Sequence, residues 1–343
     1  PSSSSGKAPE EEDPKFQEEV LELQKFCRAG ALLEAMRLLE TLEQRMKQKG
    51  QQLPAFFRSD QIQRLREIRD RRASYLKRLV EPAWKDGQSW ATIELTDPEV
   101  SPDFKMVMRM RFARGSERSA AGGSQVVIGT HAEGFPLPLT KFIAFHSQTK
   151  HLQKEWIKDC EKLIGRSATT DNIYTALVIS LLAPKILPWN LEDVILRNFV
   201  VYKEAPPLKN GRPGVMVMES SPPEGATQCN GVDIPQPRRG VLQILGSEKL
   251  NFIMPSKLGT DSVDVISSVR IQIPVPQWLV NLELIKRFLA DLFTNSLKNI
   301  KQKVIGQWDK LEFDDEILRD PDFFSQVEAI VDAAKKSAQE TAG

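Results

Sequence analysis

One stretch decides the fold of this chain: Ser262-Val-Asp-Val-Ile-Ser-Ser-Val-Arg-Ile-Gln-Ile-Pro-Val-Pro-Gln-Trp-Leu-Val-Asn281. Up to Ile273, valine and isoleucine alternate with polar residues, which predicts a β-strand with one buried face. From Pro276 the apolar residues take the spacing of an amphipathic helix, which continues to about Gly306. The stretch therefore leads from a strand directly into a long helix near the C-terminal end.

Further short strands precede this one. The clearest runs from Phe104 to Phe112, where Met106, Met108 and Met110 point one way and charged residues point the other. Predicted strands lie at 90–96, 104–112, 125–130, 173–181, 196–202, 214–220, 240–245, 249–254 and 262–273, and predicted helices at 137–146 and 150–164. Because turn-length links join most strands, we expect antiparallel pairing. The prediction is an α+β fold of the helix-grip type: a curved antiparallel β-sheet around a long C-terminal helix.

The N-terminal part, residues 1–82, differs from the rest in composition and in the spacing of its apolar residues. Residues 1–13 are rich in serine and then acidic, which predicts a disordered tail. Residues 14–82 predict an α-helical hairpin, because an apolar stripe runs to Gly50, weakened at Gly30, and another begins near Ser59. We expect residues 83–306 to form the main domain and 307–343 to form an extension with one helix, starting at Asp320-Pro321.

Composition limits the function classes. The chain has 47 Lys and Arg against 46 Asp and Glu, so nucleic acid is not a predicted partner. Its three cysteines are far apart, which favours a reducing compartment, here the cytoplasm, with an organelle left open. The apolar run 173–183 is too short for a membrane span, which needs about 20 residues.

Signals of catalysis and of metal binding are missing from the sequence. His131, His146 and His151 do not have the spacing of a metal set. The chain has no Gly-x-Ser-x-Gly elbow, no Walker loop and no Gly-x-Gly-x-x-Gly fingerprint. We therefore predict no catalytic residue, no metal and no cofactor.

Four local patterns, in this order, resemble the START (steroidogenic acute regulatory protein-related lipid transfer) domain over residues 72–304. They are Gly134-Phe-Pro-Leu-Pro-Leu-Thr-Lys-Phe-Ile143, Lys154-Glu155-Trp156, Leu196-Arg197-Asn198-Phe199-Val200 and Ile273-Pro-Val-Pro-Gln-Trp-Leu-Val-Asn281. The resemblance implies a non-enzymatic protein with a hydrophobic tunnel between the sheet and the final helix. One lipid or sterol would bind there, and the C-terminal helix or the loop 236–240 would gate the tunnel.

The same resemblance implies a set of tunnel-lining residues. Methionine suits a variable apolar guest because its side chain is flexible and polarizable, although methionines are also common in packed cores. Arg197 and Arg239 would either be paired structurally or meet the polar head of a ligand. The predicted lining is Met106, Met108, Met110, Trp156, Val178, Arg197, Phe199, Met216, Met218, Arg239, Phe252, Met254, Val265, Trp278, Leu282, Ile285 and Leu289.

A basic stripe marks the second arm of the hairpin. It includes Arg64, Arg69, Arg71 and Arg72, opposite apolar residues such as Leu65. Such a stripe is either a solvated helix face or a docking surface for an anionic membrane or a protein partner.

Two other functions stay open beside lipid binding and transfer. One is a structural or interaction subunit that uses a START-like scaffold, and the other is a cyclase- or hydrolase-like enzyme on the helix-grip fold.

Overall fold

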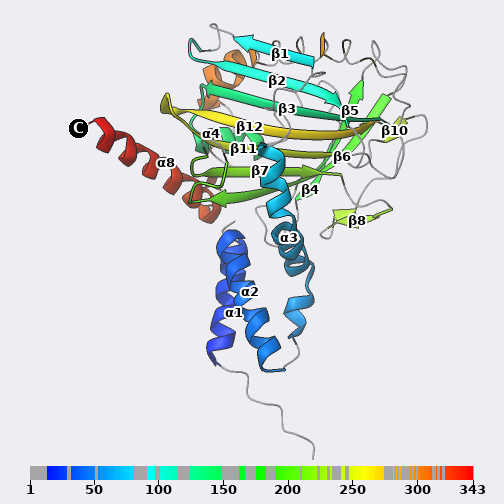
Figure 1. Cartoon of the computed structure of the whole chain (residues 1–343), viewed down its shortest axis with the longest axis vertical. Helices are drawn as coiled ribbons and strands as arrows, with labels where there is room; N and C mark the ends of the chain where they lie inside the picture. The colour runs from blue at the N-terminus through cyan, green and yellow to red at the C-terminus, as the bar shows by residue number, and fades with distance from the viewer. Residues whose placement is uncertain are drawn as a thin grey trace, which may run out of the picture.

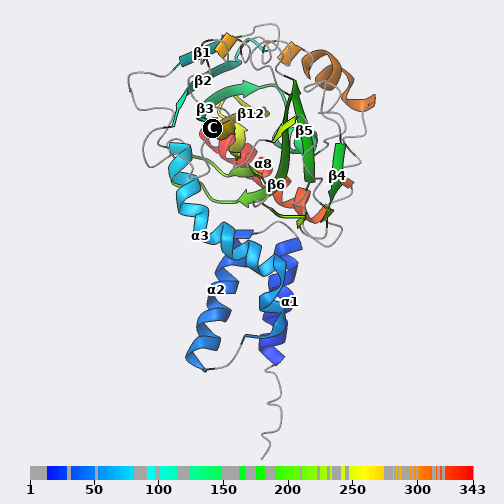
Figure 2. The same ribbon diagram turned by 90° about the vertical axis from the view of Figure 1, so that its right-hand side faces the viewer.

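The computed structural model describes residues 14–28, 32–50, 53–80, 91–96, 101–113, 124–147, 162–166, 175–182, 190–208, 211–221, 225–229, 232–233, 241–243, 247–273, 281, 283, 286–287, 290, 294, 297–298, 300–310, 314, 317–318 and 321–342. In this part of the chain one large curved sheet forms the centre, and the N-terminal helices extend from one of its faces (Figure 1). The strands curl into an arc when the molecule is turned by 90° (Figure 2).

The sheet confirms the predicted α+β class. Ten described strands form it in the order β1-β2-β3-β12-β11-β7-β6-β5-β4, with β10 beside β6. All neighbours are antiparallel except β10 and β6, which are parallel. The strands are β1 Ala91–Thr96, β2 Lys105–Phe112, β3 Ser124–Phe135, β4 Lys162–Arg166, β5 Thr175–Leu182, β6 Asn190–Tyr202, β7 Gly214–Ser220, β10 Val241–Gln243, β11 Glu248–Ser256 and β12 Gly259–Ile273, and a separate pair joins β8 Gln228–Cys229 to β9 Val232–Asp233.

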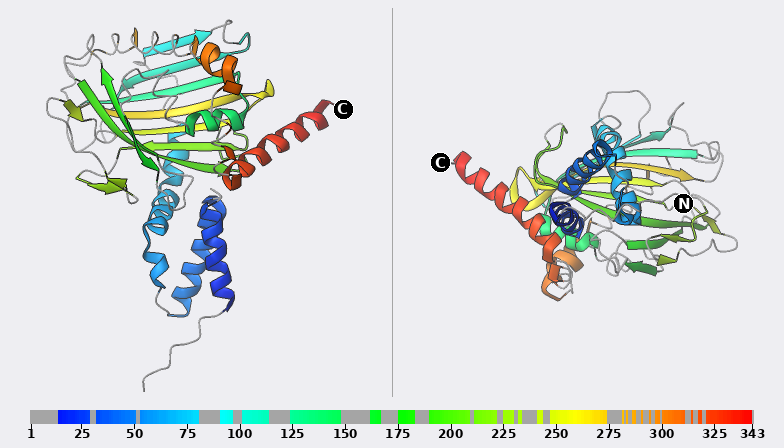
Figure 3. Two further views of the ribbon diagram at one scale, coloured as in Figure 1. Left: turned by 180° about the vertical axis from the view of Figure 1, so that it is seen from behind. Right: turned by 90° about the horizontal axis from the view of Figure 1, so that it is seen from below.

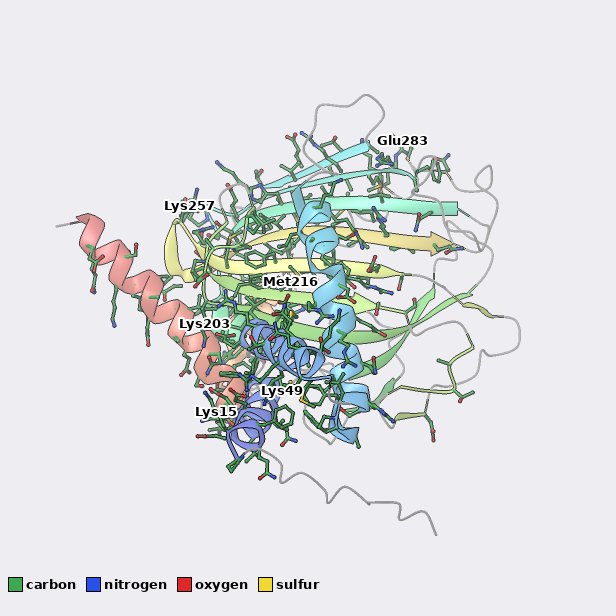
Figure 4. All side chains as sticks on the ribbon, turned by 60° about the horizontal axis from the view of Figure 1, so that its bottom comes forward. Lys15, Lys49, Lys203, Met216, Lys257 and Glu283 are labelled. Carbon is green, nitrogen blue, oxygen red and sulfur yellow. The ribbon has the colours of Figure 1, made fainter. Side chains whose placement is uncertain are left out.

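Both faces of the central strands are buried. Along β6, β7 and β11, successive side chains alternate between two hydrophobic clusters, as the period of a strand requires. We call the face of Val215 and Val217 the inner face, which α4 and the C-terminal helices cover. We call the face of Met216 and Met218 the outer face, which the N-terminal helices cover. Figure 4 labels Met216 where the sheet meets these helices.

The N-terminal helices are α1 Pro14–Arg28, α2 Leu32–Gln48 and α3 Asp60–Val80, with a 3-10 turn η1 Ala55–Arg58 before α3. Helices α2 and α3 contact the sheet, and α1 packs on α2. The stripe expected to form one helix up to Gly50 thus forms two. Arg45 of α2 binds Glu19 of α1 with nitrogen–oxygen distances of 2.5 and 3.1 Å. In one continuous helix, residues 26 apart would lie about 39 Å from each other. The hairpin arms are therefore α1 and α2, and α3 is a third helix.

A carboxylate on α2 ties α3 to the bundle, which gives a first prediction. Glu43 accepts hydrogen bonds from Arg66 Nε at 2.7 Å and from Arg69 Nη1 at 3.0 Å. Since these side chains are partly exposed, we expect Glu43→Gln to lower the free energy of unfolding by about 1 kcal/mol in urea titration. Glu40→Gln, at an exposed position of the same helix, is the control. Equal losses in the two variants would contradict a role for the bridge.

The chain passes from β3 into α4 Leu139–Ser147 through the motif that begins at Gly134. Gly134 has a φ of +68°, and an added Cβ would lie 2.9 Å from the backbone oxygen of Asp103. Only glycine fits this position without strain. The helix expected over 137–146 is therefore present, and it places Phe142, Ile143 and Phe145 on the inner face. Of the helix expected over 150–164, residues 150–161 are outside the described part of the structure. Residues 162–164 lie in β4, where pairing with β5 overrides local preference.

The C-terminal region closes one end of the inner face. The described positions from Glu283 to Lys298 are helical, in the region where the long closing helix was expected. A π-turn η4 Ile300–Val304 and a 3-10 turn η5 Ile305–Lys310 follow. The last helix, α8 Pro321–Ala342, buries its first turns in the inner cluster and then projects away from the body (Figure 3).

Candidate functional site

The inner face of the sheet is organised in rows of side chains that run across the strands. The first row is entirely apolar and lies under α4 and α8, in the inner hydrophobic cluster. It is therefore covered by resident side chains of the protein. From β1 to β6, the register gives Leu95, Met106, Ala132, Val265, Ile253, Val215 and Val201 in this row.

The second and third rows have a different composition. They are apolar at the β1–β2 end, where Met108 and Met110 are 2% and 0% exposed, and polar further along. From β1 to β6, the second row is Ile93, Met108, Thr130, Ser267, Asn251, Val217 and Phe199. The third row is Ala91, Met110, Ile128, Val269, Lys249, Glu219 and Arg197. The third row is thus amphipathic, with apolar side chains at the β1–β2 end and charged ones at the β7–β6 end, whereas the second row becomes apolar again at Val217 and Phe199.

The charged end is built around a buried carboxylate. Arg197 and Glu219 face each other across β6 and β7, and Arg197 Nε donates to Glu219 at 2.6 Å. The two residues are 6% and 7% exposed. Lys249, on β11, places its ammonium 3.6 Å from the other oxygen of Glu219. Burial raises the pKa of Glu219, but the charges of Arg197 and Lys249 outweigh it and lower the pKa to about 2.

His146 joins this group from α4. Its backbone carbonyl accepts a hydrogen bond from Arg197, and its ring lies 4.8 Å from that of Phe142. Burial and the nearby charge of Arg197 lower its pKa to about 4, so the imidazole is neutral at pH 7. The four side chains together carry one net positive charge at that pH. Such a group can hold a polar or anionic head by hydrogen bonds and charge.

The structure separates the methionines that the sequence placed on one interior. Met106, Met108 and Met110 lie on the inner face, whereas Met216 and Met218 lie on the outer face. Phe252 and Met254 also pack with the N-terminal helices on the outer face. The physical reason is that β7 is apolar on both faces, so its composition does not reveal which side faces which layer. On β11 the apolar face of Phe252 and Met254 packs on the N-terminal helices, and the opposite face carries Lys249 and Asn251.

The other predicted lining residues fall into two groups. Phe199, Val265 and Arg197 lie on the inner face. The side chains of Trp156, Val178, Arg239, Trp278, Leu282, Ile285 and Leu289 are outside the described part of the structure. The inner face also contains Glu219, Lys249 and His146, which the sequence reasoning did not select. Glu219 is near the end of β7 and Lys249 is near the start of β11, but only the strand register shows that they meet.

The basic stripe of α3 is partly used inside the chain. Arg69 forms ion pairs with Glu43 and Asp70, both at 3.0 Å. Arg71 is exposed, and a hydrogen bond with Tyr75, the largest contribution, raises its pKa against the opposing effect of burial. The side chains of Arg64 and Arg72 are not described.

Two absences hold for the described residues. No helix there has the combined length and hydropathy that crossing a membrane demands. No cluster of three or more His, Cys, Asp and Glu side chains there has an arrangement suited to a metal ion.

Comparison with known proteins finds matches among the solved structures. No protein-family model matches the chain, and no curated protein matches it significantly. The crystal structure of human STARD10 matches with 14% sequence identity and a TM-score of 0.40, covering 76% of this chain and 84% of that one. That protein is a START domain, the same family that the sequence resembles.

Proposed function

We propose that this chain binds a single lipid or sterol against the inner face of its sheet and transfers it between membranes. The amphipathic character of the third row on the inner face supports this function. The third row leads from the buried Met110 on β2 to the buried pair of Glu219 and Arg197, across one continuous set of strands, and Met108 lies beside Met110 on β2. A guest with a hydrocarbon part and a polar head matches that order of side chains.

Burial of hydrocarbon alone can supply the binding free energy of such a guest, without a contribution from any catalytic group. Removing hydrocarbon from water contributes about 0.8 kcal/mol per CH₂, so one long acyl chain supplies on the order of 10 kcal/mol before other terms. Met108 and Met110 offer flexible, polarizable contacts that adapt to chains of different shape. Lys249, whose side chain is 26% exposed, is the group best placed for a polar or anionic head. We therefore propose binding and transport rather than catalysis.

Gating, docking and location belong to the same proposal. The C-terminal helix or the loop 236–240 would open to admit the guest; the loop is outside the described residues. The N-terminal helices share a core with the outer face, so residues 14–82 would act as a rigid docking element for a protein or an anionic membrane. Of the predicted docking arginines whose side chains are described, Arg69 and Arg71, the exposed one is Arg71, which supports membrane contact. A cytoplasmic location with peripheral membrane contact would suit this use.

Native mass spectrometry of the purified full chain, followed by lipid extraction, tests the proposal. We expect one lipid or sterol molecule per chain, and transfer of that lipid between vesicles. Protein that stays free of lipid after incubation with mixed vesicles would favour the scaffold alternative.

A pair of matched variants localises the guest. Met108→Phe on the inner face adds volume where the ligand would lie, whereas Met218→Phe adds the same volume on the outer face. We expect the first variant to lose about tenfold in lipid affinity, since excluding two methylenes costs about 1.6 kcal/mol. Both variants overpack a buried site, so their stabilities should be similar. Equal losses of lipid in both would contradict binding on the inner face.

A further inference from the structure

Polar groups are buried without partners where the last turns of α3 meet the outer face. Arg78 is 7% exposed and donates from Nη1 to the carboxylate of Glu248 on β11. Among the described residues, its Nε and Nη2 have no hydrogen-bond partner. Desolvated guanidinium groups are costly unless every N–H group is satisfied. The Nε–Nη2 edge of this guanidinium is therefore buried without a hydrogen-bond acceptor among the described residues.

The sheet supplies two more such groups beside Arg78. Arg270 on β12 lies directly opposite Glu248 in the register, and Ser268 is two residues before it on the same face. Ser268 is 1% exposed. Within the described structure, Arg270 Nε and Ser268 Oγ are also buried without a hydrogen-bond partner. The helix α3 and the strand β12 thus both contribute unsatisfied hydrogen-bonding groups to the interface between them.

The charges around these groups are unbalanced. Glu248 is the carboxylate that pairs with Arg78, while Arg270 adds a second positive charge. Burial and the charge of Arg270 lower the pKa of Arg78, against the opposite effect of Glu248. Arg109 on β2 is in the same cross-strand row as Ser268, and Gly129 between them has no side chain. The guanidinium groups of Arg78 and Arg270 and the one carboxylate of Glu248 leave an excess of one positive charge.

We propose that this cluster binds a phosphate group through Nε and Nη2 of Arg78, Nε of Arg270 and the hydroxyl of Ser268. One edge of a guanidinium matches two oxygens of a phosphate, and the remaining two donors suit its other oxygens. A soluble phosphate ester and a lipid headgroup both present this chemistry. Since Arg78 belongs to α3 and the other two residues to β12, the bound phosphate fastens the N-terminal helices to the sheet. The site is on the opposite face from the proposed lipid, and its existence does not depend on that proposal.

Thermal unfolding of the full chain with inorganic phosphate tests this site, with sodium chloride at equal ionic strength as reference. We expect phosphate to raise Tm; at a concentration of 100 times Kd, it favours the folded state by about 100-fold. Arg270→Gln should abolish the response. Arg270→Lys keeps the positive charge but loses the planar set of N–H donors of the guanidinium group. It should weaken phosphate binding by about tenfold. Arg37→Gln, an exposed arginine of α2, removes the same charge and should keep the response.

Vesicles separate the two sources of phosphate. We compare phosphatidylcholine vesicles with vesicles that also contain phosphatidic acid. A Tm response to inorganic phosphate without vesicle binding supports a soluble ester, and vesicle binding that Arg270→Gln abolishes supports a headgroup. If Arg270→Gln does not fold, Ser268→Ala should still weaken the response several-fold. The proposal is overturned if phosphate acts no differently from chloride and the vesicles do not bind, or if Arg37→Gln loses as much as Arg270→Gln.

Discussion

Glu219→Ala is expected to lower the free energy of unfolding by about 3–5 kcal/mol, as measured by urea titration. The substitution removes the carboxylate from a group in which Arg197 binds Glu219 and Lys249 lies 3.6 Å from it. Arg197 is 6% exposed and would stay buried without its counter-ion. The loss comes mainly from that uncompensated charge rather than from the missing contact.

A double variant distinguishes these two causes. Arg197→Met with Glu219→Leu removes both charges and keeps apolar volume, so it should recover most of the lost stability. Glu133→Ala, at an exposed carboxylate of β3, should change stability by less than about 0.5 kcal/mol. A double variant as unstable as Glu219→Ala would show that the pair contributes packing and not charge balance.

Acid is expected to destabilise the fold in two overlapping ranges, and His146 accounts for the first. Its pKa is about 4 in the folded protein and 6.5 ordinarily, so the unfolded chain binds the proton more readily. The associated stability is therefore complete above pH 6.5 and is lost as the pH falls toward 4. Glu219, with a pKa lowered from 4.5 to about 2, acts in the same direction between pH 4.5 and 2. Each group contributes on the order of 3 kcal/mol.

Urea titrations at a series of pH values measure this dependence. His146→Phe should flatten the curve between pH 6.5 and 4, and its ring can still pack on Phe142. A slope below pH 4 should remain, because Arg197 and Lys249 still lower the pKa of Glu219. His131→Phe, on the outer face of β3, serves as the matched control and should keep the full slope. An unchanged slope in His146→Phe would mean that this histidine does not resist protonation in the folded state.

The sequence predicted the sheet because each strand alternates or is continuously apolar between turns. It did not predict which face of β7 looks inward, because Val215, Met216, Val217 and Met218 are all buried. Alternation of apolar and polar residues identifies the buried face of a strand only when the other face is exposed to solvent. The pairing of Arg197 with Glu219 was hidden for a related reason, since residues 22 apart become neighbours only through the register of β6 and β7.

The helical part shows the same limit. The apolar stripe predicted helix correctly over most of the residues up to Gly50, yet it could not show that α1 and α2 are separate and packed together. Periodicity is a property of one element, whereas the bridge between Arg45 and Glu19 depends on how two elements meet. Lys162–Arg166 is the converse case, because a strand partner decides its conformation.

Strand β7 has a practical consequence for anyone who trims this protein. Its two faces belong to two separate hydrophobic clusters. Removing the helices that cover either face would therefore expose a large apolar surface of the sheet. A fragment that starts after Val80 would present Met216, Met218, Phe252 and Met254 to water, and patches of that kind drive self-association. The sheet and its N-terminal helices should therefore be expressed, purified and crystallised as one piece.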